Sequence, residues 1–101
     1  MEIFNTGSIA NSNVLDPKTI KKKYPEARVI VLDDDFNTFE HVANCLQAII
    51  PGMSKDRSWK LTIEVDSTGS AEVWRGPLEQ AELYHQQLQS KGLTMAPIEK
   101  I

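Results

Sequence analysis

The apolar positions of residues 27–32 form a β-branched run, ARVIVL, that ends directly at three aspartates. A short run of this kind, bounded by polar residues, predicts a strand buried in a sheet. From residue 39 the pattern changes, and apolar side chains recur every three or four positions, which predicts an amphipathic helix. The apolar face of this helix consists of Phe39, Val42, Ala43, Leu46, Ile49 and Ile50. The change of period therefore predicts that a strand leads into a helix through an acidic loop.

Local signals mark both ends of this helix. Asn37 or Thr38 can cap its amino end, and Glu40 in its first turn favours the helix dipole. The sequence PGMS stops the helix after residue 50.

The segment SKDRSWKLTIEVDSTGS supports two interpretations. Trp59, Leu61, Ile63 and Val65 alternate with polar residues, which predicts a strand. Ser54, as a possible N-cap, and a second set of residues on one helical face predict a helix instead. The local pattern alone slightly favours the strand.

The last third of the chain contains the clearest helix. A short strand, AEVW, follows the turn STGS, and PLEQAELYHQQLQSKG then has proline at its start, glutamate early, lysine late and glycine after its end. LTMAPIEKI is expected to be a final edge strand, because Pro97 cannot donate a hydrogen bond to a sheet. The core-facing stripe of the helix is expected to consist of Leu78, Ala81, Leu83, Tyr84 and Leu88.

The order of these elements predicts an α+β fold in which helices cover a small sheet. Residues 1–25 are polar and show no sustained period, so we expect a flexible N-terminal arm followed by a core domain at residues 26–101.

Composition narrows the possible functions. The chain has 101 residues, enough for one small domain, and its net charge of -3 argues against binding nucleic acid through a basic surface. The basic cluster KTIKKKYPEAR is interpreted as a solvated linker. The single cysteine, Cys45, allows no internal disulfide and is expected in the core. No apolar run is long enough for a membrane span and no signal peptide is evident, so we expect a soluble, cytoplasmic protein without a membrane contact.

The three aspartates at positions 33–35 allow three interpretations. A phosphoacceptor receiver domain would hold magnesium with such acids, but it also requires a later acceptor aspartate, and no aspartate follows Asp66. Alternatively, the acids cap the next helix and remain solvated, although three exceed what one cap needs. In the third interpretation, the carboxylates hold an organic ammonium group at the rim of an apolar pocket.

The stretch VIVLDDDFNTFEHV resembles the signature of the ClpS family, adaptors of the bacterial Clp AAA+ protease. LTIEVDSTGSA and GLTMAPIEK resemble two further elements of the family in the same order, so the resemblance covers about residues 27–100. The segment EQAELYHQQLQSKGL is most similar to a cyanobacterial branch. The resemblance implies a helix at residues 55–66. It thus implies a three-stranded antiparallel sheet packed against three helices in the order β-α-α-β-α-β.

The resemblance also implies the function. ClpS proteins bind the α-amino group and the large hydrophobic first side chain of N-degron substrates, and they catalyse no reaction. The expected amine-binding residues are Asp33, Asp34, Asp35 and Asp66. The expected hydrophobic pocket consists of Asn37, Thr38, Phe39, Val42, Thr62, Val65 and Met95.

Several of these positions depart from the family pattern. Asp33 stands where the family has asparagine and Asp66 where it has histidine, which predicts an unusually acidic site. Phe39 and Thr62 replace methionines of the pocket. No cofactor is expected, and His41 and His85, both expected to face solvent, lack the spacing of a metal site.

The expected partners follow from the resemblance as well. They are the N-terminal domain of a ClpA- or ClpC-type unfoldase and substrates that begin with Leu, Phe, Tyr or Trp. The alternative is an interaction module that regulates the Clp machine without binding N-degrons.

Overall fold

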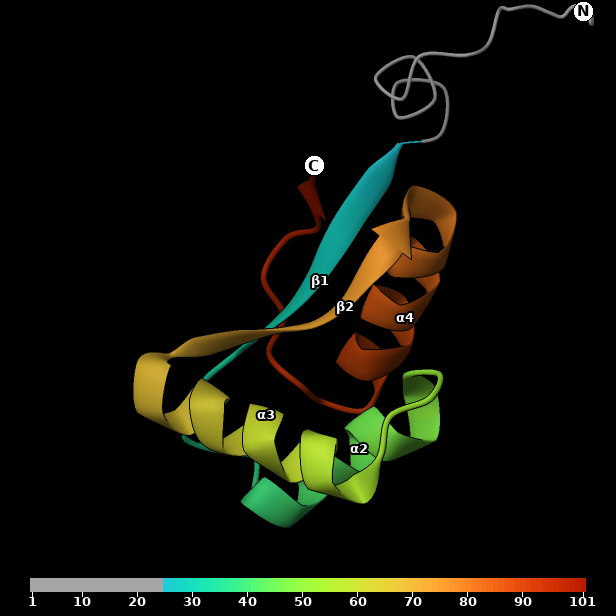
Figure 1. Ribbon diagram of the computed structural model, residues 1–101. Helices are drawn as coiled ribbons and strands as arrows, with labels where there is room; N and C mark the ends of the chain where they lie inside the picture. The colour runs from blue at the N-terminus through green and yellow to red at the C-terminus, as the bar shows by residue number, and fades with distance from the viewer. Residues whose placement is uncertain (1–24) are drawn as a thin grey trace, which may run out of the picture.

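A computed structural model describes residues 25–101, so the expected arm, apart from Pro25, lies outside the described residues. The elements pack as a three-stranded antiparallel sheet, in the order β2-β1-β3, with three helices (Figure 1). This architecture confirms the predicted α+β fold and the predicted order of elements. The elements are β1 (Glu26–Leu32), α2 (Phe39–Ile49), α3 (Lys55–Thr68), β2 (Ser70–Pro77), α4 (Leu78–Ser90) and β3 (Glu99–Lys100).

Strand β1 lies at the centre of the sheet. Its side chains alternate, so that Ala27, Val29 and Val31 are buried in the core while their neighbours reach the surface. The pairing with β2 contains a bulge after Val29, where Val73 is an extra residue of β2. A bulge increases the local twist of a sheet.

Helix α4 lies along β1 and β2 in Figure 1. Ala81 and Leu88 on this helix are fully buried, as predicted, but Leu83 is 47% exposed. The prediction for Leu83 was wrong because residues 81 and 83 are about 200° apart around a helix and cannot share a narrow stripe. His85 was also expected to face solvent; it is half-buried, and its Nε2 donates to the carbonyl oxygen of Ala96 at 2.8 Å.

Trp74 of β2 fixes the contact between the sheet and α4. Its ring meets Tyr84 edge to face, with ring centroids 5.0 Å apart and planes at 77°. The same indole covers Gly76, where an added Cβ would overlap the ring atoms. A side chain at position 76 would therefore force the indole of Trp74 to move.

The segment with two interpretations is a helix, α3. It begins at Ser54, whose side chain accepts from the Arg57 N–H, and it ends at Gly69, which has a φ of 97°. The implied range, 55–66, is confirmed and extends two residues further. Ile63 is 53% exposed, although an alternating strand would bury it with Leu61 and Val65. The alternation in the sequence was therefore coincidental.

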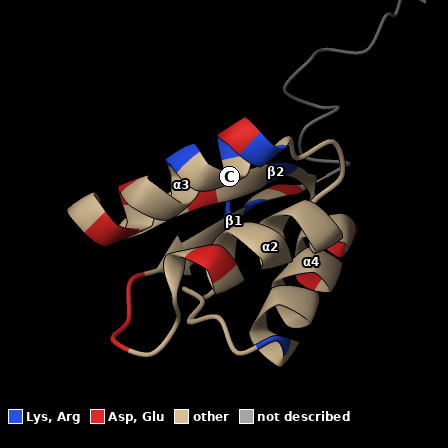
Figure 2. Ribbon diagram, turned by 90° about the horizontal axis from the view of Figure 1, so that it is seen from below, with Lys and Arg blue, Asp and Glu red and all other residues tan. Residues whose placement is uncertain are grey.

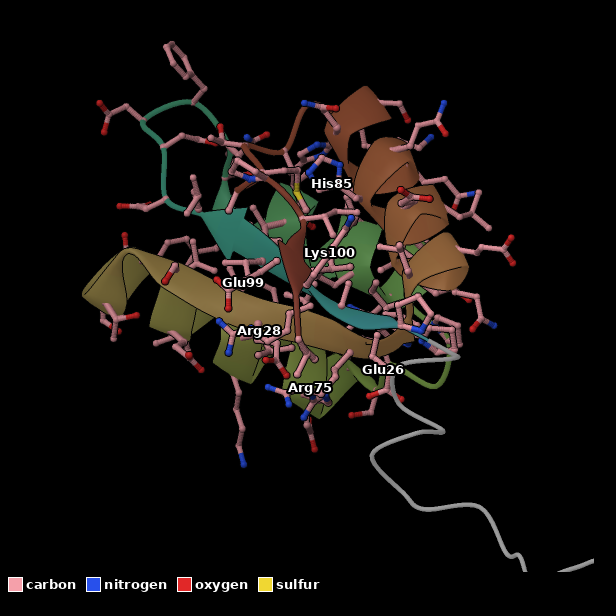
Figure 3. All side chains as sticks on the ribbon, turned by 90° about the horizontal axis from the view of Figure 1, so that it is seen from above. Glu26, Arg28, Arg75, His85, Glu99 and Lys100 are labelled. Atoms are coloured by element: carbon pink, nitrogen blue, oxygen red, sulfur yellow. The ribbon has the colours of Figure 1, made fainter. Side chains whose placement is uncertain are left out.

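The third strand is shorter than the predicted edge strand. Only Glu99–Lys100 pair with β1, together with an isolated bridge between Met95 and Val31. Charges on this face of the sheet connect the three strands: Arg28 lies 2.6 Å from Glu99 (Figure 3). Arg28 also lies 3.3 Å from Glu72 of β2.

Candidate functional site

The acidic loop after β1 is positioned by the start of α2. Thr38 is the N-cap, because its Oγ1 accepts from the His41 N–H at 3.1 Å. Asn37, the other predicted cap, contacts Asp34 instead. The loop is thus closed at its far end by an ordinary helix cap.

Asp33 connects the loop to the end of α3. Its backbone N–H donates to the carbonyl oxygen of Gly69 at 3.0 Å. Gly69 follows α3, and Asp66 lies in the last turn of that helix. Figure 2 shows acidic residues in the loop after β1 and on the neighbouring end of α3. Negative charges 33 residues apart in the sequence are thereby collected at one place.

Asp34 has a different environment from its neighbours. Its Oδ1 accepts the backbone N–H groups of Phe36 at 2.8 Å and Asn37 at 2.7 Å. Its Oδ2 accepts Asn37 Nδ2 at 2.7 Å and Thr94 Oγ1 at 2.8 Å. These donors, the Asn37 N–H above all, hold the pKa of the Asp34 carboxyl well below its usual range.

A hollow lies between the loop and the α2–α3 pair. Its empty volume, including the part open to solvent, is about 380 Å³. Acidic side chains come from the loop and from α3, and apolar side chains come from β1, α2 and α3. The lining consists of Leu32, Asp33, Asp34, Asn37, Phe39, Val42, Thr62, Val65 and Asp66.

The inner part of the hollow is apolar, although one of its residues, Thr62, has a polar side chain. Val42 and Val65 are almost fully buried, and Thr62 is 2% exposed. The hydroxyl of Thr62 donates to the carbonyl oxygen of Ser58 at 2.8 Å. Because this hydroxyl already has a partner in its own helix, it demands no polar group from a ligand.

Three of the predicted site residues do not line the hollow. Asp35 is exposed on the loop, and the Thr38 side chain is turned toward its capping bond. Met95 packs against the core and pairs with Val31. Leu32 was missed, although it is the last apolar residue before the aspartates and its place at the end of the strand indicates a role at the rim.

The carboxylates of Asp33 and Asp66 lie at the rim of the hollow. Neither forms a side-chain hydrogen bond or ion pair with another residue of the described range 25–101, and both are exposed. Within that range no three His, Cys, Asp or Glu residues are arranged to hold a metal ion. No described helix is long and apolar enough to cross a membrane.

The geometry defines a class: a small α+β domain with an acidic rim above an apolar hollow. Comparison with known families agrees, because the model of the family described as ATP-dependent Clp protease adaptor protein ClpS matches residues 22–96. The chain belongs to the ClpS family of Clp protease adaptors.

Individual relatives show the same affiliation. The Clp protease adapter protein ClpS of Synechocystis sp. is 63% identical over 82 residues, which is 81% of this chain and 84% of that protein. The ClpS of Nostoc sp. is 61% identical over 82 residues, with the same coverage. The chain therefore resembles cyanobacterial members of the family, as predicted.

A solved structure supports the fold. Agrobacterium tumefaciens ClpS2, bound to L-phenylalaninamide, superposes with a TM-score of 0.71 at 24% identity and covers 76% of this chain and 98% of its own.

Proposed function

We propose that this chain binds the first residue of N-degron substrates and delivers these substrates to a Clp AAA+ unfoldase for degradation. One observation carries the proposal: exposed carboxylates and buried apolar side chains line the same opening. The first residue of a polypeptide offers the matching pair of groups, an α-ammonium and a side chain attached to the same Cα atom.

The rim suits an ammonium group. The α-amino group of a polypeptide has a pKa of about 7.7–8.0 and is mostly charged at neutral pH. Asp33 and Asp66 can each accept a charge-assisted hydrogen bond from it, worth roughly 1.5–3 kcal/mol. An internal peptide bond has no such cation, so the site would select chain ends.

We assign the direct amine contacts to Asp33 and Asp66 and a different role to Asp34. An ionised carboxylate has about four acceptor positions. Asp34 already uses its oxygens for four donors of this chain, so it organises the loop. Asp35 contributes charge to the rim without lining the hollow.

The hollow suits a large apolar side chain. Burying a Leu or Phe side chain contributes roughly 1.5–3 kcal/mol. Together with the amine contacts this approaches about -8 kcal/mol, the range of micromolar binding. Val42, Val65 and Leu32 would contact the side chain, and Phe39, 43% exposed, would close over it from the rim.

The relatives support this proposal. Phenylalaninamide, the molecule bound to the Agrobacterium protein, carries a free α-amine beside a phenyl side chain. The chain is expected to accept Leu, Phe, Tyr or Trp as first residue, to dock on the N-terminal domain of a ClpA- or ClpC-type unfoldase and to act in the cytoplasm.

Fluorescence titration with peptides that differ only in the first residue tests the proposal. Phe- and Leu-starting peptides should bind with micromolar affinity, and a Gly-starting peptide with the same free amine should bind at least tenfold more weakly. Equal affinity for the three peptides, or no binding of any, would favour the alternative of a Clp regulator without an N-degron site.

A further inference from the structure

Asp34 connects the acidic loop with a segment near the other end of the chain. Thr94, 60 residues later, donates its hydroxyl to Asp34 Oδ2 at 2.8 Å. Asn37, which also bonds to Asp34, donates through Nδ2 to the carbonyl oxygen of Gly92 at 2.9 Å. We call residues 92–96 the C-terminal strap. Two side chains of the loop therefore hold the strap at two points.

The strap also contacts the strand that leads into the loop. The Leu32 N–H donates to the carbonyl oxygen of Thr94 at 2.8 Å, and the Ala96 N–H donates to the carbonyl oxygen of Ile30 at 3.0 Å. On its other side, Ala96 accepts from His85 of α4. The strap is thus bonded to β1 and α4 and lies beside the loop.

Asp33 lies between two residues that the strap fixes. Leu32, before it, is bonded through its backbone to Thr94, and Asp34, after it, is bonded to the Thr94 hydroxyl. Thr94 therefore holds both neighbours of Asp33. Its own side chain does not line the hollow, so its effect on a ligand has to pass through the loop.

We propose that Thr94 is a positioning residue for the amine site: its hydroxyl, through Asp34, sets where the loop presents the Asp33 carboxylate to the ligand. The inference rests on the function proposed above. Without the Thr94 bond, Asp34 keeps its three local donors and Asn37 keeps its bond to Gly92, so the loop remains closed but loses one of the two side-chain contacts that hold it against the strap. A binding site loses affinity when an unbound loop has to be ordered by the ligand.

Three variants separate the effect of the Thr94 hydroxyl on peptide binding from the effects of side-chain volume and of general destabilisation. Thr94→Val removes the hydroxyl at nearly constant volume, whereas Thr94→Ser restores it without the methyl group. Ser90→Ala is the matched control, because among the described residues the Ser90 hydroxyl bonds only to Gln87 of its own helix. Each variant is titrated with a Phe-starting peptide, and its thermal midpoint is recorded.

Thr94→Val should weaken peptide binding about threefold to tenfold, the range expected for the net effect of one hydrogen bond. Thr94→Ser and Ser90→Ala should stay within about twofold of the wild type, as expected for variants that keep the bond. Wild-type affinity in Thr94→Val, or an equal loss in Thr94→Ser, would overturn the inference.

A measurement without peptide keeps the two proposals distinguishable. Carboxyl-carbon NMR should show the pKa of Asp34 rising in Thr94→Val and not in Ser90→Ala, because one donor to its carboxylate is lost. An unchanged Asp34 titration would overturn the link itself. If the wild type binds no peptide while this titration shifts, the proposed function fails and the loop–strap link stands.

Discussion

The backbone N–H of Asp33 donates to the carbonyl oxygen of Gly69 at 3.0 Å. This single bond joins the end of β1 to the end of α3, and it brings Asp33 and Asp66 to the same opening. The acidity of the rim therefore depends on two segments that are distant in sequence.

The carboxylates of Asp33 and Asp66 should contribute little to the stability of the fold and strongly to the affinity for a peptide. We expect Asp33→Asn and Asp66→Asn each to weaken binding of a Phe-starting peptide about tenfold, since each removes a charged acceptor. Titration by fluorescence anisotropy gives the dissociation constants. Asp56→Asn on the exposed first turn of α3 is the matched control. An equal loss in the control would show that overall charge, and not the rim, is responsible.

The size of the hollow should be set partly by Thr62. Thr62→Met places a longer side chain in the opening, and we expect it to weaken binding of Phe-starting peptides at least tenfold, in line with the roughly 1–3 kcal/mol cost of overpacking. Thr62→Val, of nearly the same volume, should retain affinity close to that of the wild type. If Thr62→Met bound Phe-starting peptides as well as Thr62→Val, the first side chain would have to lie elsewhere.

Asp34 should make the protein sensitive to acid. Its pKa is lowered in the folded state, so it stabilises the fold at pH values above the unfolded value of about 3.9. That contribution is lost as the pH falls toward the lower folded pKa. Asp34→Asn should therefore reduce the free energy of unfolding at pH 7 by roughly 1–3 kcal/mol and flatten its dependence on pH below about 4.

Urea unfolding at several pH values measures this effect. Asp35→Asn is the control on the same loop, because the Asp35 carboxylate has no hydrogen-bond partner in the described range. If both variants showed the same pH dependence, the hydrogen bonds to Asp34 would not matter for stability.

A side chain at Gly76 should displace the indole of Trp74 and destabilise the fold. Gly76→Ala directs a Cβ into the indole ring, and we expect it to lower the free energy of unfolding by roughly 1–3 kcal/mol. The double variant Gly76→Ala/Trp74→Phe should recover part of that loss, since the smaller ring leaves space. Thermal unfolding followed by circular dichroism gives the values. A double variant less stable than the sum of both single changes would contradict the steric explanation.

How far the sequence predicts this structure depends on the range of the interactions. The strand at residues 27–32 and the helix at residues 78–90 carry strong local signals, and both are present. The apolar residues of α3 alternate in the sequence and so favoured a strand. In the structure Leu61 and Val65 are buried and Ile63 is exposed, as the helix requires. The family resemblance, and not the local pattern, identified that helix.

The candidate site also combines features that have a local signal in the sequence with features that depend on distant residues. Asp33 and Val42 both line the hollow, because the residues that follow a buried strand and begin the next helix lie at the edge of a sheet. The contact of Thr94 with Asp34 has no local signal, since it depends on where the chain returns 60 residues later. Asp34 lines the hollow, and the sequence pattern does not indicate that its carboxylate is also bonded to Thr94 and to the loop itself.

The central claim is that the rim binds a charged α-amine, and N-acetylation tests it most directly. Calorimetric titration at pH 7 should give micromolar affinity for a Phe-starting peptide and at least a hundredfold loss for its N-acetylated form, since the acetyl group removes the charge. Affinity for the free peptide should also fall above about pH 8, where the amine loses its proton. Equal affinity for the free and the acetylated peptide would contradict the claim.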